Sequence, residues 1–298
     1  MIARGDLFAA VIVTRNRPDT VQRSLDALEE QSEGDFATVV VDQSRPADPR
    51  LEQRVSTDPR LHLVRDVGSG SARARNVGWR HAGARWIAFL DDDTPPEPDW
   101  AACLREELEA HPDVDMVSGQ VAARGAPEGD YQTLGEFSVD EPRVLTGRWV
   151  RPWRVAGGVC TIRRATIERL GGFDERFGPG SADFPAVEDM DFNIRLMRSG
   201  GVVYLTPRVR VSHEQWRTRT EVLAVYAAYN RGWGGLVVKQ LRTGDPLGAA
   251  RLTASRLRGI GKVARSGVAR RSSLRLCLAR TELGGFVRGA AKALGRDW

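Results

Sequence analysis

The chain has 298 residues, of which 41% are hydrophobic and 28% charged, a composition typical of a globular protein and not of a disordered one. Its three cysteines lie far apart without a CxxC pair, so we expect neither a disulfide framework nor a cysteine zinc site, and a reducing compartment fits. No apolar run approaches the roughly 18 residues that a membrane-spanning helix needs.

The net charge of +5 conceals two oppositely charged regions. Residues 214–298 contain 17 basic and 5 acidic side chains, a net charge of +12, so residues 1–213 carry −7. A basic tail favours a polyanionic partner, either membrane lipid head groups or nucleic acid. The acidic body indicates chemistry that uses carboxylates.

The first third of the chain alternates strands and helices. Four apolar runs predict buried strands, at residues 8–13, 38–41, 61–64 and 86–90. The first run has no small-residue cleavage site, so it predicts a strand and not a signal peptide. Between strands, Val21, Leu25 and Leu28 recur at helical spacing, and a second helix opens at Gly68 and runs to about His81. This alternation predicts an α/β fold whose mainly parallel sheet is covered by helices on both faces.

Polar side chains follow three of these strands where each ends. Thr14 and Arg15 follow the first strand, Asp42 follows the second, and the residues 91–93 (Asp-Asp-Asp) follow the fourth. Ligands of such sheets bind at the carboxyl ends of the strands. Three adjacent carboxylates need a counter-charge, and Mg²⁺ or Mn²⁺ bridging to a phosphate would supply it. The alternative is a solvated acidic turn.

The remaining elements are predicted from apolar runs and from turn residues. Asp99 is a candidate N-cap for a helix that starts at Trp100. We then expect strands at 114–121 and 156–162 around a long loop at 122–154, a helix stop at 171–174, a turn-rich loop at 177–185, a helix over 188–200, short strands at 202–205 and 209–211, and basic helices from 220 that break at 244–246.

Three further features are each ambiguous when they are taken alone. Residues 68–73 match only the start of a GxGxxG pattern, which favours a loop that presents Arg73 or Arg75 to a diphosphate over a dinucleotide site. The alternative is that these arginines are simply solvated. Glu188 and Asp189 begin a predicted helix, where acids either complement the helix dipole or serve as a general base. His213 ends a strand and is either structural or functional.

Taken together, the motifs and their order resemble glycosyltransferase family 2, which has the GT-A fold. The resemblance covers about residues 7–215 and rests on the ordered segments Val11-Ile-Val-Thr-Arg-Asn-Arg-Pro18, Val39-Val-Val-Asp-Gln-Ser44, Ala74-Arg-Asn-x-Gly78, Phe89-Leu-Asp-Asp-Asp93, Gly171-Gly-Phe-Asp-Glu175, Glu188-Asp-Met-Asp-Phe192 and a terminal His213. It implies a Rossmann-like, mainly parallel central sheet flanked by helices, with a C-terminal helical extension.

The resemblance also implies roles for individual residues. The nucleotide-sugar site would consist of Thr14, Arg15, Asp42, Arg75, Asp91 and Asp92. A divalent ion, Mn²⁺ or Mg²⁺, would bind to Asp91, Asp93 and His213, of which the first two match the acids of the family's Asp-x-Asp motif. Asp189 is favoured over the adjacent Glu188 as the catalytic base.

These assignments predict a metal-dependent, inverting, hexosyltransferase-type enzyme with a single-displacement mechanism. The sugar would pass from a nucleotide-diphosphate donor, with UDP or dTDP favoured, to an acceptor hydroxyl in the synthesis of a cell-surface or lipid-linked glycan. Two alternatives from other classes are a non-catalytic GT-A module that binds carbohydrate or lipid, and a sugar-1-phosphate nucleotidyltransferase.

The predicted organisation is a catalytic domain at 1–215, with a nucleotide-binding half at 1–93 and an acceptor half at 94–215, followed by a basic helical extension at 216–298. Trp149 and Trp153 are candidates for stacking on the acceptor, or else pack in the core. For the extension we expect contact with an anionic membrane surface. The alternatives are packing on the body, a homo-oligomer contact and nucleic-acid binding. The protein would be cytoplasmic, peripheral at the inner face of the plasma membrane.

Overall fold

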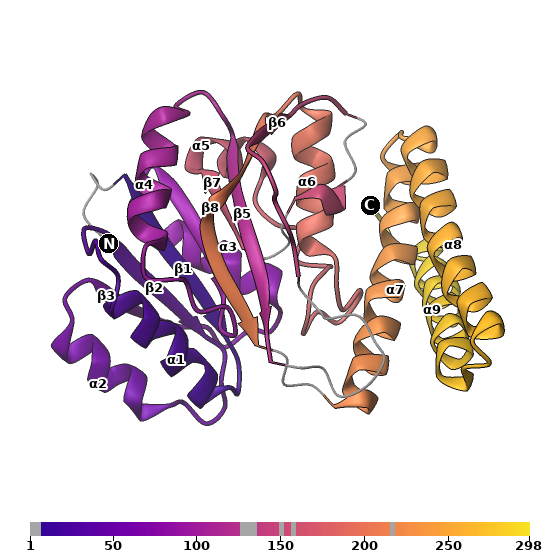
Figure 1. Cartoon of the computed structure of the whole chain (residues 1–298), viewed down its shortest axis with the longest axis horizontal. Coiled ribbons are helices and arrows are strands. Elements are labelled where there is room, and N and C mark those ends of the chain that lie inside the picture. Colours follow the sequence, from indigo (N-terminus) through magenta and orange to yellow (C-terminus); the bar gives the residue numbers. More distant parts are fainter. Residues whose placement is uncertain (1–6, 126–135, 149–151, 156–158, 215–217) are drawn as a thin grey trace. The chain divides into compact units, whose positions relative to one another are not determined.

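The structure of the protein, a computed structural model, describes residues 7–125, 136–148, 152–155, 159–214 and 218–298 (Figure 1). The chain forms two compact units. The first consists of Met1–Asp174 and Asp189–Trp216, and the second of Glu175–Glu188 and Arg217–Trp298. The second unit therefore combines the C-terminal helices with a short segment from the middle of the chain.

A sheet of eight strands forms the centre of the first unit, in the order β3-β2-β1-β4-β7-β5-β8-β6. The strands are β1 (Phe8–Thr14), β2 (Ala37–Asp42), β3 (Leu61–Arg65), β4 (Trp86–Asp91), β5 (Met116–Arg124), β6 (Arg143–Leu145), β7 (Cys160–Arg163) and β8 (Val203–Glu214). The neighbours from β3 to β4 pair in parallel, as do β5 and β8, whereas β7 and β6 run antiparallel to their neighbours. The predicted α/β class with a mainly parallel sheet is confirmed.

Helices cover both faces of this sheet (Figure 1). One core cluster joins alternate strand residues to α1 (Pro18–Glu29), α2 (Pro49–Thr57) and α4 (Trp100–Ala110). The other joins the opposite strand residues to α3 (Ser71–His81), α5 (Arg164–Leu170) and α6 (Glu188–Arg198). The strands are apolar throughout because each of their two faces packs against a layer of helices.

The structure differs from the predicted elements in a few places. The two short strands expected near residue 207 are one strand, β8, which stays continuous because its register with β5 shifts between Ser118 and Gln120. The helix α2 has no counterpart in the prediction. Asp99 occupies the N-cap position of α4, but its side chain makes no capping hydrogen bond and accepts one from Arg210 Nη2 at 3.0 Å instead.

The second unit contains the three helices α7 (Arg219–Arg242), α8 (Pro246–Ala269) and α9 (Ser273–Leu294). Three of its side chains form a buried polar contact between the helices: Arg256 donates to Asn230 Oδ1 and to Glu282 Oε1, both at 2.6 Å. The break at Gly244 is a left-handed turn with φ of 80°, as its sequence predicts. Among the residues placed in Figure 1, none of the helices is both long and apolar enough to cross a membrane.

Candidate active site

The strand register brings the polar strand ends together at one edge of the sheet. Thr14 is the partner of Asp42 across β1 and β2, and Val13 is the partner of Asp91 across β1 and β4. The β4 strand ends at Asp91, so Asp92 and Asp93 lie in the turn that follows it. Three of the predicted segments therefore meet where ligands of parallel sheets bind.

Hydrogen bonds within the protein neutralise much of the acidic turn. Asp92 is buried and accepts from Thr14 Oγ1 at 2.8 Å, while its backbone carbonyl accepts from Ser24 Oγ at 2.7 Å. Arg17 Nη1 lies 2.9 Å from Asp92 Oδ1 and 3.2 Å from Asp93 Oδ2. Burial raises the pKa of Asp92 to about 6, although the charge of Arg17 acts in the opposite direction. Arg17 is thus an internal counter-ion for two of the three acids.

Asp91 is paired with a different arginine, on α3. Arg75 donates from Nη2 to Asp91 Oδ1 at 2.6 Å, and the exposed fraction of the Arg75 side chain is only 4%. The guanidinium also lies 5.8 Å from the ring centroid of Phe173. A guanidinium has several N–H donors, so Arg75 can bind Asp91 and a phosphate at the same time. This position therefore suits the nucleotide contact that the sequence predicts.

A small pocket brings Asp189 together with Arg75. Eight residues line it: Arg75, Phe89, Cys160, Ile162, Phe173, Asp189, Phe192 and Asn193. Burial raises the pKa of the Cys160 thiol to about 12, so this cysteine is a neutral wall residue and not a nucleophile. The candidate base and the arginine that holds Asp91 therefore face a common space.

The wall of this pocket is fixed by a contact between two motifs that lie 97 residues apart. Asn76 donates to the carbonyl of Phe173 at 2.8 Å and accepts from its backbone N–H at 2.9 Å. Gly172 has φ of 78°, and a Cβ there would lie 2.5 Å from Asn76 Oδ1. Glycine is thus required at 172 by both conformation and space, and Asn76 positions the Phe173 ring.

The Glu188-Asp189 pair begins α6, as predicted. Glu188 is buried, whereas Asp189 is partly exposed and its Oδ1 accepts the backbone N–H of Met190 at 2.8 Å. Just before them, Val187 has φ of 67°, a conformation that β-branched residues rarely adopt. Such strain persists only where the surrounding structure enforces it, and it concentrates at functional sites.

His213 lies beside the acidic turn because the end of β8 runs along it. The backbone of Ser212 donates to the carbonyl of Pro95 at 3.0 Å, and His213 Nε2 is 3.8 Å from Asp93 Oδ1. Over the described part of the chain, no group of three or more His, Cys, Asp or Glu side chains forms a ready-made metal site. The carboxylate of Asp93 still suits a hard ion such as Mg²⁺ or Mn²⁺, since Mg²⁺ usually binds through one or two carboxylates together with substrate phosphates.

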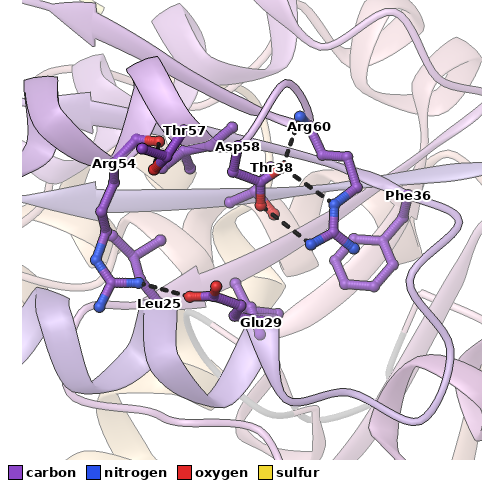
Figure 2. A pocket seen from close by; sticks show the side chains of 10 residues that line it. Leu25, Glu29, Phe36, Thr38, Arg54, Thr57, Asp58 and Arg60 are labelled. Carbon is purple, nitrogen blue, oxygen red and sulfur yellow. Dashed lines mark hydrogen bonds and ion pairs between the residues drawn. The ribbon is translucent and has the colours of Figure 1, made fainter.

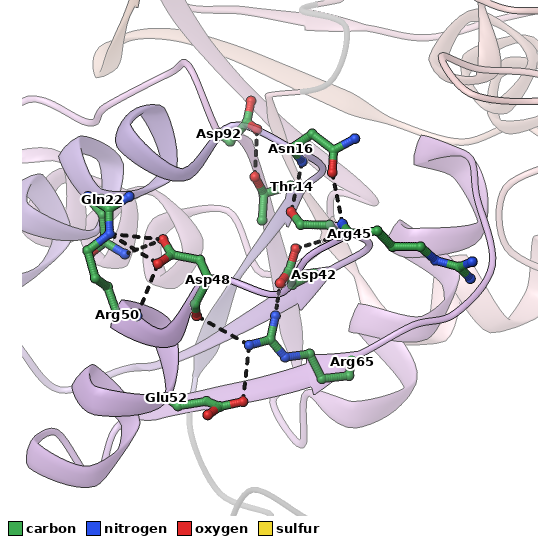
Figure 3. Close-up of polar contacts among 11 residues, drawn as sticks. Thr14, Asn16, Gln22, Asp42, Arg45, Asp48, Arg50, Glu52, Arg65 and Asp92 are labelled. Carbon is green, nitrogen blue, oxygen red and sulfur yellow. Dashed lines mark hydrogen bonds and ion pairs between the residues drawn. The ribbon is translucent and has the colours of Figure 1, made fainter.

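Two of the predicted base and ribose contacts, Thr14 and Asp42, end neighbouring strands within a group of polar contacts (Figure 3). Asp42 is buried, forms an ion pair with Arg65 and accepts from the backbone N–H of Ser44 at 2.8 Å. Asn16 joins the neighbouring loop to this turn, because its N–H donates to Ser44 Oγ at 2.7 Å. Arg15 is exposed on the same loop. Arg73, the other arginine candidate, pairs with Asp66 at 3.0 Å.

Of the two predicted acceptor residues, the structure describes only Trp153. Trp149 is outside the described residues, and Trp153 is half-buried in a short 3-10 helix at Pro152–Arg154.

A second pocket, shown in Figure 2, lies where β2 and β3 begin, at the opposite edge of the sheet from Asp91. Its arginines Arg54 and Arg60 pair with acids of the pocket itself, so we assign it no part in the site.

Sequence reasoning did not identify Arg17, Arg65 or Phe173. Arg17 had a usable signal, because it follows the first strand at the edge where the acidic strand ends were expected. Arg65 likewise ends the third strand. Phe173 belongs to the motif at 171–175, but only the folded chain shows that it meets Arg75.

Comparisons with known proteins agree with this arrangement. The family model described as "Glycosyl transferase family 2" matches residues 9–169. Two solved structures are similar over nearly the whole chain. The mannosyltransferase PcManGT from Pyrobaculum calidifontis, in complex with GDP-Man and Mn²⁺, has a TM-score of 0.62 and 22% identity, covering 97% of this chain and 87% of that one. Residues 1–349 of S. aureus TarS have a TM-score of 0.56 and 14% identity, covering 98% and 92%. These likenesses confirm the GT-A fold.

Curated relatives match over a smaller part of this chain, at somewhat higher sequence identity. A "PGL/p-HBAD biosynthesis glycosyltransferase" of Mycobacterium bovis is 29% identical over 66% of this chain and 72% of its own length. The O-antigen biosynthesis protein RfbC of Myxococcus xanthus is 28% identical over 78% of this chain but only 20% of its own length. An uncharacterized glycosyltransferase of Haemophilus influenzae is 23% identical over 64% of this chain and 62% of its own. On the family match, which covers more than half of its residues, the chain belongs to glycosyl transferase family 2.

Proposed function

We propose that this glycosyltransferase moves a sugar from a nucleotide-diphosphate donor to an acceptor hydroxyl with inversion at the anomeric carbon. The observation that carries the proposal is the pocket shared by Asp189 and Arg75, because Arg75 also holds Asp91 of the acidic turn. A carboxylate and a phosphate-binding arginine thus face one space. UDP and dTDP sugars are the donors we favour.

In this proposal Asp189 acts on the acceptor and Arg75 acts on the donor. Asp189 accepts the proton of the acceptor hydroxyl while its oxygen attacks the anomeric carbon. The bond from that carbon to the diphosphate oxygen breaks, and the nucleoside diphosphate leaves with the electron pair. Arg75 would bind the diphosphate and hold it in line with the attack. Asp189 is the one carboxylate among the described residues that line this pocket, which supports a single displacement.

We infer that the acidic turn and His213 would hold Mn²⁺ or Mg²⁺ when the donor is present. The residues that fit are Asp93 and His213, with Asp91 adjoining, and the donor phosphates would complete the coordination. Such an ion supplies Lewis-acid stabilisation of the charge that develops on the leaving diphosphate. Asp42, Thr14 and Arg15 would surround the base and ribose.

A donor screen tests this proposal directly. UDP-, dTDP- and GDP-hexoses are incubated with the protein and Mn²⁺ or Mg²⁺, and release of the nucleoside diphosphate is measured. Asp189→Asn should lower the rate at least about 100-fold, the size of a general-base contribution, with the affinity for UDP unchanged. Asp93→Asn should weaken the metal-dependent part of nucleotide binding. If both variants keep the wild-type rate, these roles are wrong. If calorimetry detects no metal-dependent nucleotide binding, a non-catalytic binding module is favoured.

The setting of the reaction is proposed from the relatives and from the tail. Two relatives have names that refer to O-antigen and PGL/p-HBAD biosynthesis, which supports an acceptor on a cell-surface or lipid-linked glycan. The helix α9 presents an apolar stripe at helical spacing, and the side chains of the stripe are 38% to 60% exposed: Leu276, Leu283, Val287 and Leu294. With a net charge of +12 over residues 214–298, this surface suits an anionic membrane.

Binding to liposomes tests the membrane proposal. Vesicles with anionic lipid should retain the protein at low salt and release it as the salt rises towards 1 M, where the Debye length is about 3 Å. A Leu283→Asp, Val287→Asp variant should bind less than the wild type at low salt. Absence of binding at low salt would remove the membrane claim and leave packing or an oligomer contact as the role of the stripe.

A further inference from the structure

The loop that precedes the proposed base belongs to the second unit and not to the sheet domain. Glu175–Glu188 is part of that unit, whereas Asp189, the next residue, is part of the first. The loop closes on itself, because Gly178 donates to the carbonyl of Phe184 and Phe184 donates to that of Arg176, both at 2.9 Å. Its two phenylalanines are fully buried, and their ring centroids are 5.0 Å apart. The backbone that leads into Asp189 therefore belongs to the same compact unit as the C-terminal helices.

Trp298 completes this aromatic cluster. Its ring stacks on Phe184, with the centroids 5.7 Å apart, and lies 5.9 Å from Phe177. The guanidinium of Arg176 lies 4.4 Å above the Trp298 ring and donates to the carbonyl of Asp297 at 3.0 Å. Trp298 Nε1 donates to the carbonyl of Ala293, which ties the ring to the end of α9. The indole is thus held between α9 and the loop.

Further contacts attach the loop to the same helices. Lys292 Nζ donates to the carbonyl of Ala182 at 2.7 Å, and Arg296 forms an ion pair with Asp183. On α7, a Cβ at Gly232 would lie 2.8 Å from the carbonyl oxygen of Ala186. The helix therefore packs directly against the backbone that carries the strained Val187.

We propose that Trp298 is a positioning residue for the catalytic base: its stacking on the loop fixes the backbone through Val187 and thereby the direction of the Asp189 carboxylate. This inference rests on the proposed function, in which Asp189 takes the proton of the acceptor. The left-handed conformation at Val187 needs an external constraint. We infer that the aromatic cluster of Phe177, Phe184 and Trp298 supplies this constraint. A carboxylate displaced by about 1 Å can lower a rate about 100-fold.

The test compares Trp298→Ala with Trp298→Phe and with Val268→Ala, a large-to-small change at an exposed residue of α8 in the same unit. For Trp298→Ala we expect a kcat lowered about 10- to 100-fold, with the KM of the nucleotide sugar identified in the donor screen unchanged. Trp298→Phe keeps an aromatic ring and should restore most of the rate. Val268→Ala should behave as the wild type. Trypsin should cleave after Arg176 faster in Trp298→Ala alone.

A double-mutant cycle separates positioning from general damage. If Trp298 acts through Asp189, adding Trp298→Ala to Asp189→Asn should not slow the residual reaction further, because the carboxylate it positions is already gone. Three results would overturn the positioning role. The first is that Trp298→Ala lowers kcat equally in the wild type and in Asp189→Asn. The others are an unchanged kcat in Trp298→Ala, or a lower kcat without faster cleavage after Arg176. A wild-type rate in Asp189→Asn instead overturns the proposed function, so the two failures are distinguishable.

Discussion

The buried contact between α8 and α9 allows a quantitative test of how the helical unit is held together. Only 4% of the Glu282 side chain is exposed, and Arg256 donates to it at 2.6 Å, while 24% of the Arg256 side chain remains exposed. Burial raises the pKa of Glu282, although Arg256 opposes that shift. Replacing Arg256 with Met removes the counter-charge and also the donor to Asn230, but leaves the carboxyl in place.

The expected loss follows from the burial of the two partners. Removing one partner of a buried ion pair typically costs about 3–5 kcal/mol. Because Arg256 is partly exposed, the expected loss falls below that range, at about 2–3 kcal/mol at pH 8. With a urea slope of about 2 kcal/mol/M, the unfolding midpoint should fall by roughly 1–1.5 M. Arg258→Met, at an exposed arginine of the same helix, is the control and should change the midpoint by little.

The pH dependence supplies a second check. Because the pKa of Glu282 is higher in the folded protein than in the unfolded chain, the folded state binds the proton more tightly, and this group's contribution to stability falls as the pH rises above about 4.5. Without Arg256 the pKa should rise further, so the loss in Arg256→Met should be smaller at pH 5 than at pH 8. Glu282→Gln should remove this difference. An equal loss at both pH values would refute the reasoning.

Three further predictions concern the sheet domain. Arg75→Met should weaken the binding of the donor's nucleoside diphosphate by about 10- to 100-fold, the effect of losing one charge-assisted contact, and calorimetry with unchanged affinity would contradict the phosphate role. Asn76→Ala leaves the buried backbone of Phe173 without its partners and should lower the free energy of unfolding by about 2–3 kcal/mol, whereas a loss under 1 kcal/mol in urea would argue against it. Gly119→Ala should lower the melting temperature, because a Cβ there would collide with the carbonyl oxygen of Val209. An unchanged melting temperature would show that the backbone of β8 can move away at little cost.

Hydrophobic patterning was enough to predict most of the first unit. Continuous apolar runs identify the four parallel strands because both faces of the sheet are covered, and the carboxyl ends of those strands identify Thr14, Asp42 and Asp91 as neighbours. The break before Pro246 likewise separates two helices of the tail, since proline and glycine act locally.

Features that depend on distant contacts could not be predicted in this way. The roles of Asn76 and Gly172 come from a contact across 97 residues, and nothing local in either motif specifies it. The membership of residues 175–188 in the helical unit depends on aromatic packing with Trp298, which has no periodic signal. Arg17 could have been found, because the charge of the acidic turn requires a nearby cation.

The split origin of the second unit has a consequence for how the protein is made. Residues 175–188 leave the ribosome about a hundred residues before Trp298, so at 5–20 residues per second they wait roughly 5–20 s for their partners. During that interval Phe177 and Phe184 lack the tail residues that later cover them. The sheet domain can therefore collapse early, whereas the backbone that leads into Asp189 settles only after Trp298 has been synthesised. The acidic strand ends would then be in place before the proposed base.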